Sequence, residues 1–496
     1  MNTKSLLIGL VLVAQGCSFA PHAAPPASVA RVPDGFENVQ IPGAYAPAGW
    51  WASFADPTLD GLLDEALVGN LDLQEAVARI QESRALLGIS TSALFPSVTG
   101  TANASRSSSP TNTGFSRQIA ELLGGLGGDS TGAEPPADGA ADADDEVGRF
   151  EVATYSAALG FAYELDFWGR LRNDRSAAMA DLAAAEADLH TARLGVLSET
   201  ITSYFDYVDL RERVALTTEI VDVLQEREAL TEGRYDRGLV TSLELYQVRQ
   251  DLRNTQAGLP QLRTLFSDAE RRLALLVGRF PSEVRELLGS DQPTLDAGDI
   301  PPGIPADLLL QRPDIRSAAA RYEAARYRVG ARKAELIPSV SLSASLGLES
   351  NEPGGLFDLS QWVSNLAAGL TAPLFQGGRL RANVSAAEAR YAAAGAAYGR
   401  VVLTAYGEVE LALVRHDEER TRLEFLESQL EESRSSLDLQ SRRYASGVAG
   451  YTDYLDALRT RLVSEATLTS ARRDFALSRL AVHRALGGGW IPASTE

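Results

Sequence analysis

The chain contains two matching segments, RYDRGLVTSLELYQVR and RYASGVAGYTDYLDALR, centred on Gly238 and Gly447, which lie 209 residues apart. The same offset aligns GRLRN at 169–173 with GRLRA at 378–382. Long stretches rich in helix-forming residues flank both glycines. An internal repeat of this kind constrains the fold strongly, because each copy must form the same structural unit. We therefore predict two long helical hairpins, each turning at one of these glycines.

The predicted hairpins require very long helices. No proline occurs between Pro136 and Pro260, or between Pro373 and Pro492. A helix over 174–235 would be about 90 Å long at 1.5 Å per residue, a length that indicates a coiled-coil structure. The alternative is a dimeric coiled coil of a structural protein. Apolar residues recur every seven positions, as coiled coils require, at Leu216, Val223 and Leu230 and at Leu423, Leu430, Leu437 and Tyr444.

Four segments alternate apolar residues with small or polar ones, which is the pattern of half-buried strands. They predict two β-hairpins, one at about 97–165 and one at about 339–374. The first hairpin encloses a long acidic loop, about 105–149, which we expect to be exposed. A soluble sandwich is the alternative, but two hairpins provide too few strands for one.

Strands of this length can span a bilayer when they are tilted. Open sheet edges are not tolerated in lipid, and the strands of one chain are too few to close a barrel. We therefore predict that several chains each donate two hairpins to one barrel. Three chains would give about twelve strands, within the even-numbered range of known barrels.

The N-terminus is typical of a secretory signal peptide, which we predict over 1–16. Lys4 precedes an apolar run at 6–14, and this run is too short to span a bilayer.

The only cysteine of the chain, Cys17, follows the small residue Gly16 at the end of the apolar run. This position indicates lipoprotein processing, with Cys17 acylated as the new N-terminus and anchored in the membrane. A single cysteine also excludes an intrachain disulfide. A lipidated N-terminal linker would then occupy 17–50. The alternative is ordinary cleavage after a small residue such as Ala20 or Ala24.

Charge and composition exclude several function classes. The formal net charge is −20, and a nucleic-acid partner is not expected because phosphate backbones bind clustered Lys and Arg. The four histidines show no metal-ligand spacing. No Ser–His–Asp or Cys–His set, metal-binding cluster or phosphate-binding loop is apparent in the sequence. We therefore expect no enzymatic activity, no cofactor and no bound metal.

Several motifs match a known family, in the family's order and over nearly the whole mature chain. They are WWASFADPTLDGLLDEAL at 50–67, YELDFWGRLRN at 163–173, ADLLLQRPDI at 306–315, APLFQGGRLRA at 372–382, the two tip segments, and ALGGGW at 485–490. The chain resembles the TolC-family outer-membrane efflux proteins, of the lipoprotein subfamily that serves resistance-nodulation-division pumps.

The resemblance implies a mainly α fold with membrane β structure. A homotrimer would share one transmembrane β-barrel in the outer membrane, with a long α-helical barrel crossing the periplasm. The lumen would be an exit duct for small molecules such as drugs, joined by a periplasmic adaptor to an inner-membrane pump. The expected layout is a first repeat over 51–280, an inter-repeat linker in the equatorial region over 281–313, a second repeat over 314–490 and a tail over 491–496.

Two acidic residues after the second tip, Asp453 and Asp456, match the family's acidic gate and share one helix face. By resemblance they line the closed periplasmic constriction, where a ring of Asp favours cations and narrows the pore. Glu244 and Gln247 hold the equivalent positions in the first repeat. The alternative is that these acids are only solvated at a helix end. Candidate ion-pair partners that would hold the gate closed are Arg237, Arg443 and Arg459.

The tip loops place small apolar residues at the far end of a soluble helical body, which indicates a docking surface. By resemblance this is where the periplasmic adaptor binds. The alternative is a plain helical turn that uses glycine for its left-handed conformation. The residues of the two loops are Gly238, Leu239, Val240 and Thr241, and Gly447, Val448, Ala449 and Gly450.

Two other functions would use the same sequence features. A duct for type I protein secretion has the same architecture, but Cys17 and the ALGGGW ending favour the efflux duct. A structural coiled coil of the cell envelope would form no channel. Because the pump selects the cargo, the duct sequence itself is expected to be generic.

Overall fold

The computed structural model describes residues 19–22, 26, 33, 35–36, 50–110, 149–288 and 312–488. The chain divides into two compact units. The first unit comprises Met1–Ala20, Ile89–Asp174 and Gly330–Val384, and it contains the sheet. The second comprises Pro21–Gly88, Arg175–Val329 and Ser385–Glu496, and it contains most of the helical structure.

The sheet of the first unit has four strands, as the sequence predicts, in the order β1-β2-β3-β4. All neighbouring strands are antiparallel, so the strands form an up-and-down meander. Residues 105–110, predicted as the start of the acidic loop, instead continue β1 and pair with β2. The rest of the predicted loop, 111–148, lies outside the described residues. The strands are β1 (Ser97–Pro110), β2 (Arg149–Leu165), β3 (Ser339–Ser350) and β4 (Trp362–Thr371), with the short 3-10 turns η3 (Pro353–Phe357) and η4 (Leu359–Gln361) before β4.

The strand register separates an apolar face from a small or polar face. Successive strand residues point to opposite faces, so residues that are paired across the sheet share a face. One row across the sheet is apolar and consists of Val98, Phe161, Ala344 and Leu366. The adjacent row is small or polar and consists of Thr99, Gly160, Ser345 and Asn365.

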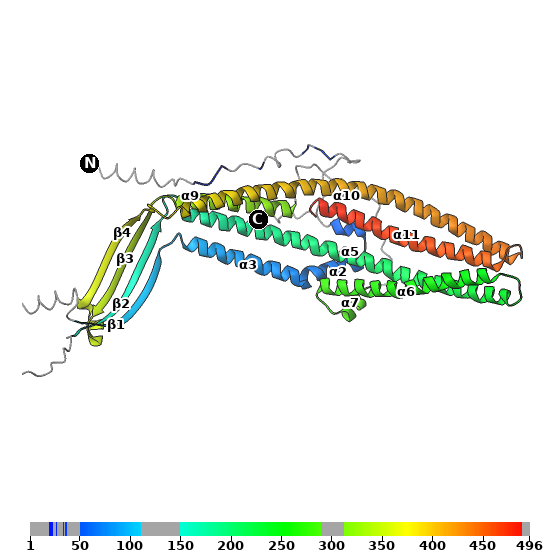
Figure 1. The fold of residues 1–496 in the computed structure, drawn as a ribbon, viewed down its shortest axis with the longest axis horizontal. Helices are drawn as coiled ribbons and strands as arrows, with labels where there is room; N and C mark the ends of the chain where they lie inside the picture. Colours follow the sequence, from blue (N-terminus) through cyan, green and yellow to red (C-terminus); the bar gives the residue numbers. More distant parts are fainter. Residues whose placement is uncertain are drawn as a thin grey trace, which may run out of the picture. The chain divides into compact units, whose positions relative to one another are not determined.

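Two long helical hairpins dominate the second unit and lie side by side, with their turns at the same end (Figure 1). The first hairpin consists of α5 (Arg170–Tyr235) and α6 (Ser242–Val277). The second consists of α10 (Arg379–Ala445) and α11 (Tyr451–Ala485). The starts of corresponding helices are 209 residues apart, so the sequence repeat is also a structural repeat. In the described residues no helix is long and apolar enough to cross a membrane.

Both hairpins turn through the same backbone motif. Gly238 and Gly447 have left-handed φ angles of 70° and 76°, which glycine adopts without steric cost. In the first turn the N–H groups of Gly238 and Leu239 donate to the carbonyls of Tyr235 and Arg234, at 2.8 and 3.0 Å. These two hydrogen bonds define a Schellman C-cap. The second turn repeats them, from Gly447 to Tyr444 and from Val448 to Arg443, both at 2.9 Å.

Shorter helices pack against the long ones. Asp56 caps the short helix that begins at Pro57 by accepting hydrogen bonds from the N–H groups of Thr58 and Leu59, at 2.9 and 3.3 Å, as an N-cap residue should. Leu59 and Ile201 are fully buried in the core between these helices and α5. The short elements are η2 (Trp50–Phe54), α2 (Pro57–Gly69), α3 (Leu71–Ser92), α7 (Pro281–Leu287) and α9 (Pro313–Ala334).

Candidate functional site

Two of the four predicted gate residues, Asp453 and Asp456, lie in the first turns of α11, next to α5 of the first hairpin. Asp456 forms an ion pair with Arg227 of α5, and the carboxylate remains half exposed. Asp453 is exposed and accepts a hydrogen bond from the N–H of Gly450 at 3.0 Å. Asp453 therefore caps the start of α11, whereas Asp456 reaches across to the other hairpin.

A tyrosine at the start of α11 makes a second contact across the hairpins. The Tyr451 hydroxyl donates to Glu226 Oε1 of α5 at 2.5 Å. This hydrogen bond raises the pKa of Tyr451 to about 12, because the carboxylate stabilises the protonated phenol. The Tyr451 ring also stacks on Tyr454 and contacts the tilted ring of Tyr444, with centroids 5.7 and 4.9 Å away. The three rings form an aromatic cluster next to the second tip.

Arg459 joins α11 to α6 instead of pairing with the gate acids. It contacts both carboxylate oxygens of Asp251, at 2.7 and 3.2 Å, in the bidentate arrangement that arginine favours. Arg237 and Arg443 form no ion pair with any residue that the structure describes. We call the cross-hairpin pairs Arg227–Asp456, Glu226–Tyr451 and Asp251–Arg459 the tip contacts.

Sequence reasoning missed Arg227 as the partner of Asp456. The available signal was the repeat itself. The position equivalent to Arg227 at an offset of 209 is Ser436, so the arginine is an addition peculiar to the first hairpin. Arg227 has no charged equivalent in the second repeat, and Asp456 has none in the first. This difference between the repeats indicates that the two residues pair with each other.

The equivalent residues of the first repeat face solvent. Gln247 is exposed, and Glu244 lies in the first turn of α6. The N–H of Glu244 donates to the Thr241 hydroxyl at 3.3 Å, so Thr241 caps α6. The role of these residues in a gate remains a prediction.

Each tip loop presents one strongly exposed apolar side chain. The exposed fraction is 69% for Leu239 and 70% for Val448. Single exposed apolar residues are normal, but two at adjacent turns form a small apolar surface. This surface is accessible to a partner, and its use for adaptor binding remains a prediction.

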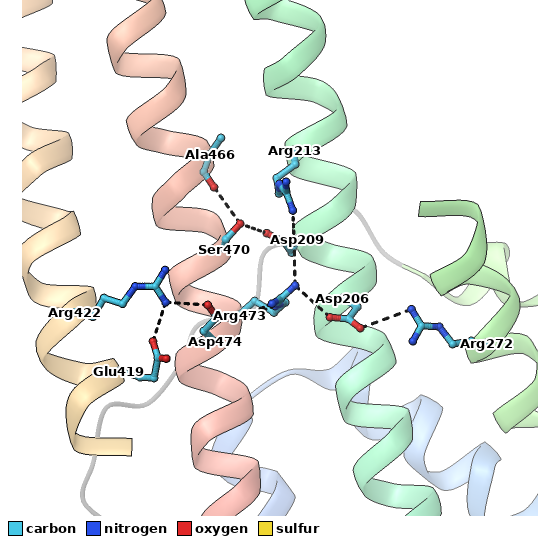
Figure 2. A network of polar contacts seen from close by, with 10 residues as sticks. All are labelled: Asp206, Asp209, Arg213, Arg272, Glu419, Arg422, Ala466, Ser470, Arg473 and Asp474. Carbon is cyan, nitrogen blue, oxygen red and sulfur yellow. Dashed lines mark hydrogen bonds and ion pairs between the residues drawn. The ribbon is translucent and has the colours of Figure 1, made fainter. Parts of the chain in front are cut away.

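A second polar site, which the sequence did not predict, lies farther along the same two helices (Figure 2). Asp209 of α5 has no exposed side-chain surface. Its carboxylate accepts a hydrogen bond from Ser470 at 2.9 Å and lies 3.5 Å from Arg213 and 3.6 Å from Arg473. One helical turn away, Asp206 lies 3.5 Å from Arg473.

This site connects four helices, and we call it the buried ion cluster (Figure 2). Arg272 of α6 approaches Asp206 at 3.8 Å. On the other side, Arg473 contacts Asp474 at 2.7 Å, and Asp474 accepts from Arg422 of α10 at 2.9 Å. Burial raises the pKa of Asp206, because the charged form loses hydration that the arginines only partly replace.

Two buried histidines of the same helices form a third feature that the sequence did not reveal. His416 Nδ1 lies 2.9 Å from the Ser478 hydroxyl, and its ring stacks on Phe475. His483 stacks on Trp50, with ring centroids 4.9 Å apart. Burial lowers the pKa of His483 to about 3, so the ring is neutral at physiological pH.

No group of three or more His, Cys, Asp or Glu residues suited to a metal ion occurs among the residues described. Cys17 lies outside the described residues, so its predicted acylation is not tested by the structure.

Comparison with known proteins identifies relatives over almost the whole chain. The family described as Outer membrane efflux protein matches residues 62–279 and 304–488. The toluene efflux pump outer membrane protein TtgI of Pseudomonas putida is 31% identical, over 99% of each chain. The probable outer membrane lipoprotein SilC of Salmonella typhimurium is 27% identical, over 98% of this chain and 99% of SilC.

A solved structure has the same fold. The Campylobacter jejuni CmeC outer membrane channel superimposes with a TM-score of 0.81 and 25% identity, over 95% of each chain.

Proposed function

This chain belongs to the outer membrane efflux protein family, and we propose that it is the exit duct of a tripartite efflux pump. It is an outer membrane component of an efflux system, and the family is one of channel proteins rather than enzymes. The finer proposal is that a homotrimer forms the duct. A periplasmic adaptor then connects the duct to an inner-membrane pump, which supplies small molecules such as drugs.

The sheet supports a barrel shared between copies. In the described sheet, β1 and β4 each pair on one side only. Their free backbone groups need partners in lipid, where water cannot satisfy them. Pairing β4 of one copy with β1 of the next satisfies both edges and closes a ring. The apolar row of the sheet would then face lipid, and the small or polar row would face the lumen.

The gate is the part of the proposal that the tip contacts support. Asp456 and Asp453 lie at the start of α11, and the tip contacts hold this helix against the first hairpin. In a trimer these carboxylates would be repeated around the pore axis and would repel one another across it. The ion pair with Arg227 partly offsets that repulsion. The closed state therefore depends on contacts that are exposed and can be exchanged for water.

The tips are also the proposed binding site of the adaptor, through the loops Gly238–Thr241 and Gly447–Gly450. Because the tip contacts begin within one or two turns of these loops, a protein bound there could reorient the start of α11. This arrangement couples adaptor binding to the gate through one short helical segment.

The proposed membrane anchor is an acyl group on Cys17. Its support is the sequence before the cysteine and the similarity to SilC, a probable outer membrane lipoprotein. Intact-mass measurement of the mature protein tests this proposal directly. A mass that corresponds to unmodified cleavage after Ala20 or Ala24 would contradict it.

The duct and its gate are tested by single-channel conductance in a planar bilayer. We expect small or flickering currents from the wild type and a several-fold larger conductance from the Asp453→Ala/Asp456→Ala double variant. Asp438→Ala provides a control, because Asp438 is an exposed acid on α10 that pairs only one turn away with Arg442. Equal, large currents from the wild type and the double variant would show that the gate lies elsewhere in the duct. The absence of current from every variant would contradict the duct itself.

A further inference from the structure

The apolar face of the sheet contains a groove of about 710 Å³, within the range of about 300 to 1,000 Å³ that is typical of ligand sites. Gly100 and Ala102 of β1 and Ala157 of β2 are too small to fill the space between the larger side chains around them. The larger side chains that line the groove are Leu159, Leu346, Leu348, Leu359 and Trp362. None of the described residues that line it is charged, so the groove suits an apolar chain.

Two arginines lie on the same face of the sheet, farther along β1 and β2. Alternate residues of a strand share a face, so Arg106 lies on the same side of β1 as Ala102. Arg106 forms an ion pair with Glu151 of β2, and its side chain is 74% exposed. Arg149 is also exposed, and its Nε donates to the Ser108 hydroxyl at 2.9 Å. Two arginines and one glutamate give this patch a positive net charge.

The arginines indicate the level at which this face would leave the hydrocarbon. A charged side chain on a lipid-facing surface is costly at the bilayer centre but not near the headgroups. Ala102 lies four residues from Arg106, which is about 14 Å along a strand at about 3.4 Å per residue and about 10 Å of depth at a tilt of about 45°. One leaflet of hydrocarbon is about 15 Å thick, half of a core of about 30 Å. The groove would therefore lie at the depth of acyl chains whose headgroups meet the arginines.

The strand ends that carry the arginines are the ends away from the helices. The other ends join helices, since β1 begins at Ser97 after α3 and β2 ends at Leu165 before α5. In the proposed duct the helical body is periplasmic, so the arginines would face the cell exterior and the groove would face the outer leaflet. The main lipid of that leaflet is lipopolysaccharide. Its membrane part, lipid A, carries phosphate groups on two sugars and several acyl chains.

We propose that the groove holds an acyl chain of lipid A while Arg106 and Arg149 bind its phosphate groups. The proposal rests on the duct proposed above, which places this face in the outer membrane, and it adds the lipid that binds there. The planar guanidinium group of arginine matches phosphate oxygens in a bidentate arrangement. A phospholipid with a single phosphate fits less well, because it offers one anionic group to two arginines. Glu151 weakens binding, because it competes with phosphate for Arg106.

The groove is tested by native mass spectrometry of the purified protein in detergent, titrated with diphosphoryl lipid A. We expect Gly100→Leu to weaken binding several-fold. A Cβ at Gly100 lies 3.8 Å from Leu159 Cδ2, an ordinary contact, so the larger side chain is tolerated and fills the groove. Ala368→Leu is the matched control. It adds similar bulk to the same face of β4, outside the groove, and should bind as the wild type does.

The arginine patch is tested with the same titration. We expect Arg106→Gln/Arg149→Gln to weaken binding of diphosphoryl lipid A several-fold and that of monophosphoryl lipid A less. Glu151→Gln should strengthen binding, because it releases Arg106. Arg379→Gln is the control, since Arg379 is an exposed arginine at the start of α10, beyond the other end of the sheet.

Several outcomes would overturn the lipid site. These are no binding of lipid A by the wild type, equal binding by the wild type and Gly100→Leu, or equal binding by the wild type and the double arginine variant. Phosphatidylglycerol that binds as tightly as lipid A would also overturn it, since the site would then select no particular lipid. Single-channel currents separate this failure from that of the duct. Wild-type currents without lipid A binding would leave the duct in place, whereas absence of current from the wild type would contradict the duct itself.

Discussion

The tip contacts and the buried ion cluster both join the first hairpin to α11 through polar side chains, but they differ in exposure. At the tips, the Asp456 side chain is 48% exposed and that of Arg227 is 21% exposed. In the buried ion cluster, the Asp209 side chain is completely buried, and the carboxylates share one arginine, Arg473. The same two helices are therefore held together at two levels by contacts of very different character.

This difference indicates which level can move. An exposed ion pair contributes about 0 to 1 kcal/mol, because water replaces the partner when the pair breaks. Breaking a buried pair leaves a charge without hydration, at a cost of about 3 to 5 kcal/mol. The buried ion cluster thus fixes α5 against α11, whereas the tip contacts can exchange at low cost. A gate at the tips requires both a fixed attachment of the two helices and contacts at the tips that break at low cost.

The largest predicted effect is the loss of Arg473. The Arg473→Leu variant leaves Asp209 with Arg213 alone and Asp206 with Arg272 alone, so we expect a loss of about 3 kcal/mol in stability. Thermal unfolding in detergent measures it as a lower midpoint. The neighbouring Arg472 is the control, because it is half exposed and lies 3.9 Å from Glu427. Equal losses of stability in Arg472→Leu and Arg473→Leu would show that the buried ion cluster contributes no more to stability than an exposed ion pair.

A second prediction concerns acid sensitivity, which should arise from the buried region. The pKa of His483 is about 3 in the folded chain and about 6.5 when unfolded. Because the unfolded state binds more protons between these values, stability should fall as the pH drops below about 6.5. The expected loss for this group is about 2 kcal/mol at pH 5.

The measurement is the difference in unfolding midpoint between pH 7.5 and pH 5, for the wild type and for His483→Gln. We expect the variant to show a smaller difference, even if it is less stable at both pH values. The raised pKa of Asp206 acts in the opposite direction, since protonation relieves its burial, and it is present in both proteins. The tip tyrosine, with a pKa of about 12, does not titrate in this range. An equal acid effect in the variant would show that another group is responsible.

The repeated architecture could be predicted from the sequence, because it depends on local signals that recur. These signals depend only on residues that are close together in the sequence. They are the glycines at the tips, the long proline-free stretches and the period-two strands. The prediction of four strands, each with an apolar and a small or polar side, was confirmed for the same reason. Asp456 was singled out through the repeat and the family pattern, and the structure places it at a contact between hairpins.

The partners across helices could not be predicted, because they depend on which faces pack together. Arg459 was expected to pair with the gate acids, but it contacts Asp251 on another helix. Asp206 and Asp209 look like ordinary surface acids of a charged helix. Only the packing of α11 on α5 buries them beside Arg473. Likewise, nothing in the sequence places His483 against Trp50, more than four hundred residues away.

A third prediction concerns the turn at the second tip. Gly447 has a φ of 76°, and a Cβ there would meet no other atom. The Gly447→Ala variant should therefore lose about 1 kcal/mol through backbone strain alone. Gly407 is the matched control, since it lies within α10 and also has open space around it. Alanine at Gly407 should stabilise the helix by about 0.5 to 1 kcal/mol. Thermal unfolding that moves both variants in the same direction would contradict this reasoning.

The smallest predicted change in stability belongs to Asp456, although its predicted change in function is large. Asp456→Asn removes an exposed ion pair, so the unfolding free energy should change by less than about 1 kcal/mol. Asp438→Asn, which removes the exposed pair with Arg442, should have an equally small effect. The two variants should differ in single-channel conductance, which rises only when the charge next to Arg227 is lost. If Asp456→Asn instead destabilises the protein as much as Arg473→Leu, the tips are as firmly held as the buried ion cluster, and a gate that opens there loses its physical basis.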